Sequence, residues 1–198
     1  MGRCTMIGRG EKDLIQVIDN FFSDEIHQEI YNLMIRPKWS FTGGNDLSPF
    51  WHMDNLENEV YFNHFLFNLI QSKLDKKFNI LRIYANGQTA GQNGTAHPDN
   101  KTDEYRRDVT FLYYPNLKWR YSWGGHLVFL DEVQGSYMDV RKQYVLHDIT
   151  PSTKVSEIVT YVPNRAILFP SHIWHHSLEP NRSFNGLRIS LAYKLVEI

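Results

Sequence analysis

Cysteine is nearly absent from this sequence of 198 residues, in which Cys4 is the only one. A single cysteine cannot form a disulfide within the chain, so the class of small secreted domains held together by disulfides is excluded. Free thiols are typical of reducing compartments, and we therefore expect a cytoplasmic protein. We expect the start of the chain, where Cys4 lies, to be frayed.

Long apolar runs are absent as well. A helix that spans a membrane needs about 18 or more consecutive apolar residues, and the sequence contains no such stretch. Residues 1–10 also lack the apolar segment of a secretory signal peptide. We therefore expect neither a leader nor any association with a membrane.

Neither sign of charge dominates, because 21 Lys and Arg stand against 22 Asp and Glu. The net charge of -1 argues against a general electrostatic attraction to nucleic acid. Hydrophobic residues make up 42% of the chain, which is ordinary for a globular protein. We expect one domain over 1–198, with a helical support region at 11–78 and a core of strands at 79–198. The sequence indicates no oligomeric state.

The amino-terminal part carries two helical patterns. Ser23 followed by two acidic residues is typical of a helix start, and apolar residues at helical spacing continue to about residue 35. A second helix is predicted over 59–76 from its broad apolar face. The segment 38–58 between them has no sustained period, and we expect it to be a long surface loop.

Short strands dominate the rest of the chain. A glycine-rich stretch at 85–95 interrupts them, and we interpret it as a mobile loop and a candidate lid. Many short strands after two helices favour a mainly β fold of the α+β class, an antiparallel barrel or sandwich of jelly-roll type with helices on one side. The predicted strands are 79–84, 108–114, 124–130, 143–149, 155–161, 165–169 and 187–195.

His97 and Asp99 form the pattern that carries most chemical information. Side chains alternate along a strand, so two residues that are two apart project from the same face. Pro98 favours an extended conformation at His97, because the residue before a proline avoids the helical region. The pair can therefore offer an imidazole nitrogen and a carboxylate oxygen to one point. The same pattern is common in surface turns, so it needs support from elsewhere.

That support lies near the end of the chain, where three histidines fall between His172 and His176 and Arg188 follows. Two histidines and one carboxylate that leave coordination positions open suit a non-haem Fe(II) that binds a co-substrate and dioxygen. An arginine on a later strand can bind a distal carboxylate through two parallel hydrogen bonds.

The order of these motifs resembles the 2-oxoglutarate- and Fe(II)-dependent dioxygenases, and within them the prolyl 4-hydroxylase-like branch. The resemblance covers roughly 80–198. The motifs that carry it are His97-Pro98-Asp99-Asn100, the strand and turn 109–116, Trp119, Gly124-Gly125-His126-Leu127 and Arg188.

The resemblance implies a double-stranded β-helix with amino-terminal helices packed on one sheet. It implies that His97, Asp99 and one histidine of 172–176 hold Fe(II), and that Arg188 binds the C5 carboxylate of 2-oxoglutarate. Tyr114 matches a tyrosine that helps to hold this carboxylate.

Two further residues are expected beside the co-substrate. Tyr84 matches a tyrosine near the iron, although a packing role is open for both tyrosines. Ser190 shares the strand face of Arg188. The implied reaction consumes 2-oxoglutarate and O2, releases succinate and CO2 and hydroxylates an aliphatic C–H bond, with ascorbate as a candidate reductant.

The third ligand is a choice between neighbours, because adjacent residues of a strand point to opposite faces. His176 begins a segment that resembles a prolyl-hydroxylase motif. His175 keeps the spacing from Phe169 and the step to Arg188 that resemble the wider superfamily. We favour His175 over His176, and both over His172.

The substrate and one alternative function stay open. The loop before His97 and the segment 133–163 are longer than the resemblance leads us to expect, and both lie where substrate choice is usually decided. A prolyl peptide, a free amino acid, another metabolite and another protein side chain are all candidates.

The alternative function is a non-catalytic jelly roll that binds a metal or a sugar, with aromatic residues at 39–51 suited to sugar stacking. A buried arginine opposite the metal would argue against it.

Overall fold

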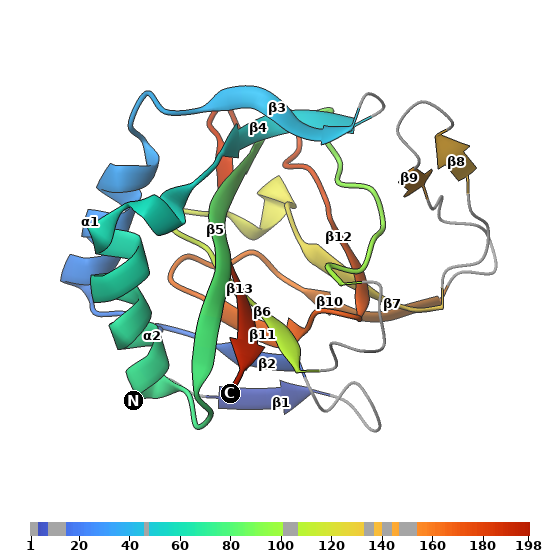
Figure 1. Cartoon of the computed structure of the whole chain (residues 1–198). Helices are drawn as coiled ribbons and strands as arrows, with labels where there is room; N and C mark the ends of the chain where they lie inside the picture. The colour runs from blue at the N-terminus through green and yellow to red at the C-terminus, as the bar shows by residue number, and fades with distance from the viewer. Residues whose placement is uncertain are drawn as a thin grey trace.

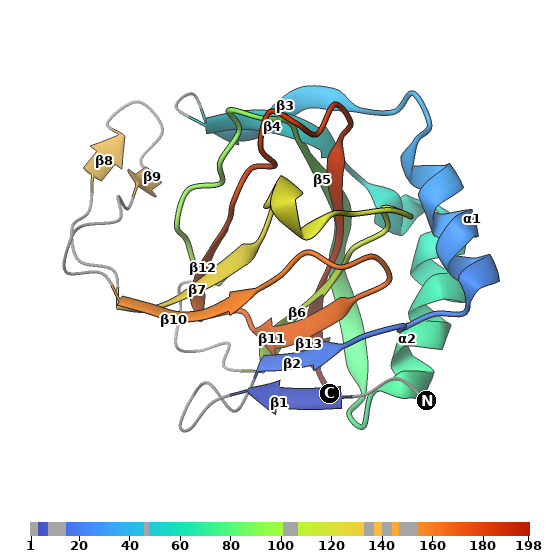
Figure 2. The ribbon, with the colours of Figure 1, turned by 180° about the vertical axis from the view of Figure 1, so that it is seen from behind.

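The computed structural model describes residues 4–7, 15–45, 48–100, 107–132, 137–139, 144–146 and 154–198. Its two α-helices, α1 (Asp24–Met34) and α2 (Phe67–Lys73), lie side by side at one side of the molecule (Figures 1 and 2). The strands of the larger sheet are β1 (Cys4–Ile7), β2 (Ile15–Ile18), β3 (Ser40–Asn45), β4 (Ser48–Met53), β5 (Phe78–Gln88), β6 (Asp108–Tyr113), β11 (Ala166–Pro170) and β13 (Arg188–Glu197). The remaining strands are β7 (Leu127–Glu132), β8 (Tyr137–Asp139), β9 (Tyr144–Leu146), β10 (Lys154–Val159) and β12 (Trp174–Ser177).

The strands form a jelly roll of two facing sheets. The larger sheet has eight strands in the order β1-β2-β11-β6-β13-β5-β4-β3, and the smaller sheet has the order β10-β7-β12. Neighbouring strands pair antiparallel throughout both sheets. Strands β8 and β9 pair with each other and lie apart from both sheets (Figures 1 and 2). The predicted mainly β fold with helices on one sheet is therefore confirmed.

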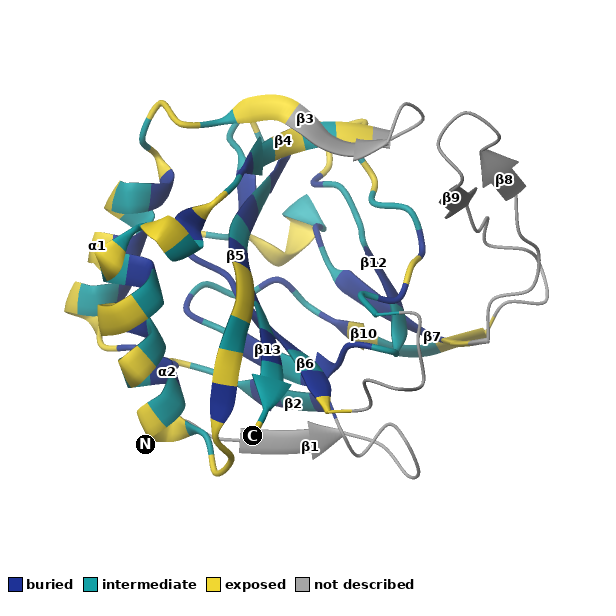
Figure 3. Ribbon diagram, viewed as in Figure 1, coloured by how far each residue is buried: buried dark blue, intermediate teal, exposed yellow. Residues whose placement is uncertain are grey.

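Two apolar layers hold this arrangement together. The helices pack their buried side chains, among them Ile30, Met34 and Ile70, against the outer face of the larger sheet. A second cluster, which includes Phe129 and Phe169, fills the space between the two sheets. Figure 3 shows the buried residues concentrated along the sheets and on the inner sides of the helices. Leu112, Leu127 and Phe169 of this inner layer line the cavity in which the site lies.

The structure corrects the predictions for the amino-terminal half. The expected loop 38–58 contains the hairpin β3–β4, because β4 pairs along β5 and extends the larger sheet. The expected helix 59–76 is shorter and begins as a π-helix, Tyr61–Leu66, before α2. The expected frayed start contains β1, which pairs with β2.

The carboxyl-terminal half departs less from the predictions. Strand β5 runs on to Gln88, so the loop expected at 85–95 begins only after this residue. Within that loop, Gly94 donates its N–H to the carbonyl oxygen of Ser177 at 2.9 Å. The strand expected at 124–130 begins at Leu127. Of the predicted strand at 143–149, only 144–146 lies within the described residues, where it forms β9. No helix in the described part of the chain is long and apolar enough to cross a membrane.

Candidate metal centre

His97 and His175 lie opposite each other across a short antiparallel bridge. Each main-chain N–H donates to the carbonyl oxygen of the other residue at 3.0 Å. Side chains that are directly opposite in an antiparallel pair project from the same face. The two imidazole centroids are accordingly 4.8 Å apart. The pairing of the His97 segment with β12 thus places the two rings together.

Main-chain carbonyls orient both imidazoles. Nδ1 of His97 lies 2.8 Å from the carbonyl oxygen of Thr95, and Nδ1 of His175 lies 2.9 Å from that of Ile173. Because a carbonyl only accepts, each Nδ1 carries a proton, which leaves Nε2 as the nitrogen that can bind a metal. Burial is the main cause that lowers the pKa of His175 to about 4, against the opposing effect of Asp99. The His175 ring is therefore neutral at pH 7, as a metal ligand must be.

Asp99 completes a three-residue group with these imidazoles. Its carboxylate oxygens lie 3.5 Å from Nε2 of His97 and 3.6 Å from Nε2 of His175. One ligand atom from each residue can be chosen so that all three lie within 4.8 Å of one another. The structure thus brings together the three residues that the sequence pattern selected.

Asp99 is held ionised although it is buried. Thr110 donates a hydrogen bond to its Oδ2 at 2.6 Å, and the ammonium group of Lys194 forms an ion pair with the same oxygen. Burial on its own raises the pKa of Asp99, but Lys194 and then His175 lower it more, so this pKa lies well below its usual value. The group therefore offers the two imidazole nitrogens and the anionic oxygen of a facial triad.

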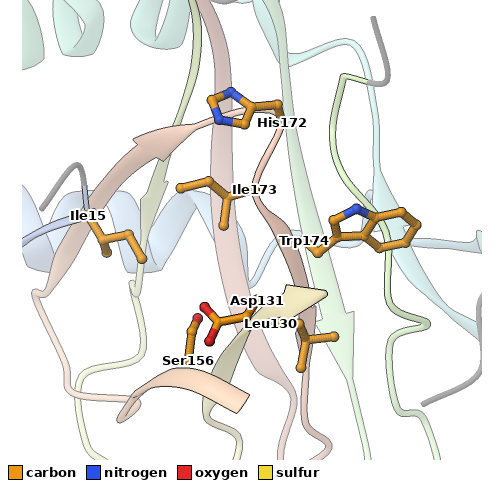
Figure 4. Close-up of a pocket in the computed structure, with 7 residues that line it drawn as sticks. All are labelled: Ile15, Leu130, Asp131, Ser156, His172, Ile173 and Trp174. Atoms are coloured by element: carbon orange, nitrogen blue, oxygen red, sulfur yellow. The ribbon is translucent and has the colours of Figure 1, made fainter. Parts of the chain in front are cut away.

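The other two histidines of the cluster do not join the group. His176 is next to His175 on β12 and projects to the opposite face, where it pairs across the sheet with Val128. His172 lines a separate cavity together with residues of β2 and of all three strands of the smaller sheet (Figure 4). Ile173 lies between His172 and Asp131 in that view. Among the described residues, the group of neighbouring ligand atoms around Asp99 thus contains neither His172 nor His176.

Arg188 is the largest fully buried side chain of the described residues. Its Nε donates to the carbonyl oxygen of Gly125 at 2.7 Å, and its Nη1 donates to Oε1 of Gln88 at 2.8 Å. Its guanidinium carbon lies 5.0 Å from the ring centroid of Tyr161 and 5.5 Å from that of Tyr114. Within the described chain, Nη2 of Arg188 has no hydrogen-bond partner. A buried guanidinium with an unused donor is suited to bind a carboxylate.

The glycine pair before β7 makes room for this arginine. Gly124 and Gly125 have φ angles of +71° and +73°, which side chains disfavour. A Cβ on Gly125 would also lie 2.9 Å from the Trp119 ring and 3.0 Å from Cδ of Arg188. A side chain at Gly125 would therefore displace Trp119 or Arg188.

The remaining predicted residues lie near Arg188 or near the triad. Ser190 and Tyr84 line the cavity that also contains His97, Asp99, His175 and Arg188. The hydroxyl of Tyr114 is buried and, like Nη2 of Arg188, has no hydrogen-bond partner in the described structure. Burial raises the pKa of Tyr114 and Arg188 opposes this, so the phenol stays protonated and can donate. Two residues with unused donors thus lie close together, and one of them, Arg188, lines the cavity.

Sequence reasoning missed four polar residues of this cavity: Asn86, Thr110, Ser177 and Lys194. The period-2 rule would have found Lys194, because it continues the face of Arg188 and Ser190 along β13. Burial alone lowers the pKa of Lys194, but Asp99 raises it more, so the net pKa is raised and the ammonium is charged. Thr110 could not be selected in this way, since its role depends on the pairing of β6 with β13.

Comparisons with known proteins agree with this geometry. The family model of the 2OG-Fe(II) oxygenase superfamily matches residues 79–193. No curated protein has a sequence that matches the chain.

Solved structures share the fold at low sequence identity. A prolyl-4-hydroxylase from Pseudomonas putida is 15% identical with a TM-score of 0.59, over 93% of this chain and 92% of that one. A prolyl hydroxylase from Trichoplax adhaerens, solved with a peptide fragment of hypoxia inducible factor, is 18% identical with a TM-score of 0.59, over 93% and 84%. HygX from Streptomyces hygroscopicus, solved with nickel and 2-oxoglutarate, is 12% identical with a TM-score of 0.63, over 92% and 82%.

Proposed function

The chain belongs to the 2OG-Fe(II) oxygenase superfamily, and from this membership and its site we propose that it hydroxylates an aliphatic C–H bond of a peptide or small-molecule substrate. As a member of this family it is an enzyme that uses Fe(II), 2-oxoglutarate and O2. One observation carries the proposal: a two-histidine, one-carboxylate group and a buried arginine with a free donor line the same cavity.

The donor set fits the metal. Fe(II) that must keep positions open for a co-substrate and O2 is suited to two imidazoles and one carboxylate on one side. His97 and His175 would supply Nε2, because their Nδ1 atoms are engaged by main-chain carbonyls. Asp99 would supply the anionic oxygen. These three residues, from the segment before β6 and from β12, are the proposed ligands.

The donors around Arg188 fit 2-oxoglutarate. Nη2 of Arg188 and the hydroxyl of Tyr114 are both buried and unpaired within the described chain, and leaving such donors without an acceptor costs free energy. The C5 carboxylate of 2-oxoglutarate would accept from both. Ser190 and Tyr84 line the same cavity as Arg188 and the proposed ligands. The rest of the co-substrate would lie beside these two residues.

When bound, the metal and co-substrate supply the oxidation: 2-oxoglutarate, O2 and a C–H bond give succinate, CO2 and an alcohol. The residues of the chain place these reactants and exclude water. Leu112, Leu127 and Phe169 form the apolar part of the cavity wall. Because Asp99 and Arg188 lie on different elements, the jelly roll sets the distance between the metal and the arginine.

The alternative, a non-catalytic jelly roll that binds a metal or a sugar, accounts for less of the structure. It explains the histidines and the carboxylate. It gives no role to a fully buried guanidinium that faces the same cavity with a free donor. Maintaining such a cation in the core is costly unless an anion is bound there.

The test is release of succinate from 2-oxoglutarate with Fe(II), O2 and ascorbate, which we propose as the reductant. The wild-type protein should release succinate, and Asp99→Ala should not, because two neutral imidazoles bind a divalent ion weakly without the anionic ligand. The matched control is Asp75→Ala, which removes an exposed carboxylate after α2 and should leave turnover unchanged. Equal turnover in the wild type and Asp99→Ala would refute the proposed ligand set. If the wild type alone releases succinate, mass spectrometry of a lysate treated with the protein should identify the substrate by a product heavier by one oxygen atom.

A further inference from the structure

Lys194 is a second buried cation in the site, and the proposed reaction gives it no role. It lies in the second half of β13, on the inner face of the sheet, and its side chain is 18% exposed. Its ammonium group forms an ion pair with Oδ2 of Asp99 and donates to Oγ1 of Thr110 at 3.1 Å. The ammonium also lies 5.6 Å from the ring centroid of Tyr84.

The position of this lysine is set by the sheet. Lys194 pairs with Thr110 across the β13–β6 ladder, so both side chains project toward the space between the sheets. Asp99 enters the same space from the segment before β6, and only 6% of its side chain is exposed. Three elements therefore hold one carboxylate, one hydroxyl and one ammonium in contact.

The charges show why this contact matters. A buried carboxylate is costly unless a positive charge compensates it. Lys194 compensates Asp99 in the protein without a metal. A divalent ion beside Asp99 would compensate it too, and the two cations would then repel each other across a short distance in a site shielded from water.

We propose that Lys194 is the resident counter-ion of Asp99, a positioning residue that holds this carboxylate in the metal-free protein and weakens the binding of the divalent ion. The site then keeps its geometry while the metal is absent. The inference rests on the proposed function, in which Asp99 is a metal ligand.

The experiment measures binding of Mn(II) by calorimetry and thermal unfolding with and without Mn(II), and it needs neither substrate nor turnover. Lys194→Met should bind Mn(II) at least tenfold more tightly than the wild type, because the repelling charge is gone. Its melting temperature without metal should fall, because Asp99 loses its partner, and saturating Mn(II) should restore most of the loss. Lys194→Arg keeps the charge and should bind Mn(II) within about threefold of the wild type.

Two further variants make the result decisive. Lys194→Gln keeps an N–H donor for Asp99 without the charge, and it should also bind Mn(II) more tightly than the wild type. It serves as the neutral variant if Lys194→Met does not fold. Lys76→Met removes an exposed lysine that pairs with Glu197 at 2.7 Å, and it should leave Mn(II) binding unchanged.

The outcomes separate the two proposals. If the wild type and the neutral variants all fail to bind Mn(II), the proposed metal site is wrong. If the wild type binds Mn(II) and the neutral variants bind it equally or more weakly, the role of Lys194 is wrong. A purely structural lysine would lower the melting temperature with and without metal alike and leave the affinity unchanged.

Discussion

Two adjacent histidines on β12 have opposite environments. His175 faces the inner layer, where its ring lies 4.8 Å from that of Phe169. His176 projects to the other face of the strand, where it pairs across the sheet with Val128. Main-chain hydrogen bonds between His97 and His175 fix which of the two neighbours faces the proposed ligands. Which of the two histidines can act as a ligand thus depends on the register of β12, because the two residues have the same side chain.

The pair of single variants tests this assignment. His175→Ala should abolish both Fe(II) binding and succinate release, because it removes a proposed ligand. His176→Ala should retain measurable turnover, because its ring lies on the other face. Anaerobic Fe(II) binding and succinate release are the measurements. The reverse pattern would mean that the register of β12 is shifted by one residue.

Arg188 should control the affinity for 2-oxoglutarate and not that for the metal. A charge-assisted pair lost from a dry cavity costs about 2–5 kcal/mol, so Arg188→Met should weaken apparent 2-oxoglutarate binding roughly 30- to 5,000-fold. Its Mn(II) affinity should remain near that of the wild type. Titration of succinate release against 2-oxoglutarate measures the effect, with exposed Arg182→Met as the control. An unchanged 2-oxoglutarate requirement would rule out this role.

At the scale of elements, a buried network fastens α1 to the larger sheet. Nδ1 of His27 lies 2.6 Å from the hydroxyl of Tyr113, which itself donates to Oδ1 of Asn164 at 2.9 Å. Asn164 has a φ angle of +59° and bonds both the N–H and the carbonyl of Phe22 through its side chain. Because Tyr113 donates to Asn164, His27 must donate through Nδ1, which leaves its Nε2 buried and unpaired.

This network predicts a pH dependence of stability. Burial is the main cause that lowers the pKa of His27 below its ordinary value, against an opposing effect of Asp24. The unfolded chain therefore binds a proton below about pH 6.5 that the folded chain resists, so the free energy of unfolding falls as the pH drops. His27→Gln should lose less stability between pH 7.5 and pH 5.5 than the wild type does.

Urea unfolding at the two pH values measures this difference. Exposed His64→Gln is the control and should show the wild-type loss. If His27→Gln loses as much stability as the wild type, protonation of His27 is not coupled to unfolding. Burial also lowers the pKa of His52, His126 and His176, so these histidines contribute to the loss of stability in every variant. Only the difference between His27→Gln and the wild type therefore reports on His27.

At the scale of the whole molecule, the site connects separate parts of the fold. Its proposed residues come from β5, the segment before β6, β12 of the smaller sheet and β13 of the larger one. No single element contains enough of them to bind either ligand. Binding should therefore stabilise the folded protein as a whole, since the unfolded chain does not hold these groups together.

Mn(II) and 2-oxoglutarate together should raise the melting temperature. Each ligand at one hundred times its Kd contributes about 2.7 kcal/mol, which is roughly 5–10 °C for a domain of this size. Removal of the metal with a chelator should reverse the shift, and Asp99→Ala should show little of it. A wild-type melting temperature that does not respond to either ligand would contradict the proposed site.

The sequence alone determined the features that depend on neighbouring residues. Ser23 begins α1, and its Oγ accepts from the N–H of Ile26 at 3.5 Å, as a helix cap does. Strand β6 follows from its density of β-forming residues, and the shared face of Arg188 and Ser190 follows from alternation along a strand. These patterns act over a few residues, so they can be read without knowing where the rest of the chain lies.

Only the tertiary structure decided what depends on pairing between distant segments. The expected loop 38–58 became the hairpin β3–β4 because β5 offers an edge for it to pair with. His175 rather than His176 joins the group because its main chain pairs with that of His97. The contact of Lys194 with Asp99 depends on the packing of β13, β6 and the segment between β5 and β6. The physical reason is the same in each case: hydrogen bonds between strands far apart in the chain set the register, and register decides which side chains meet.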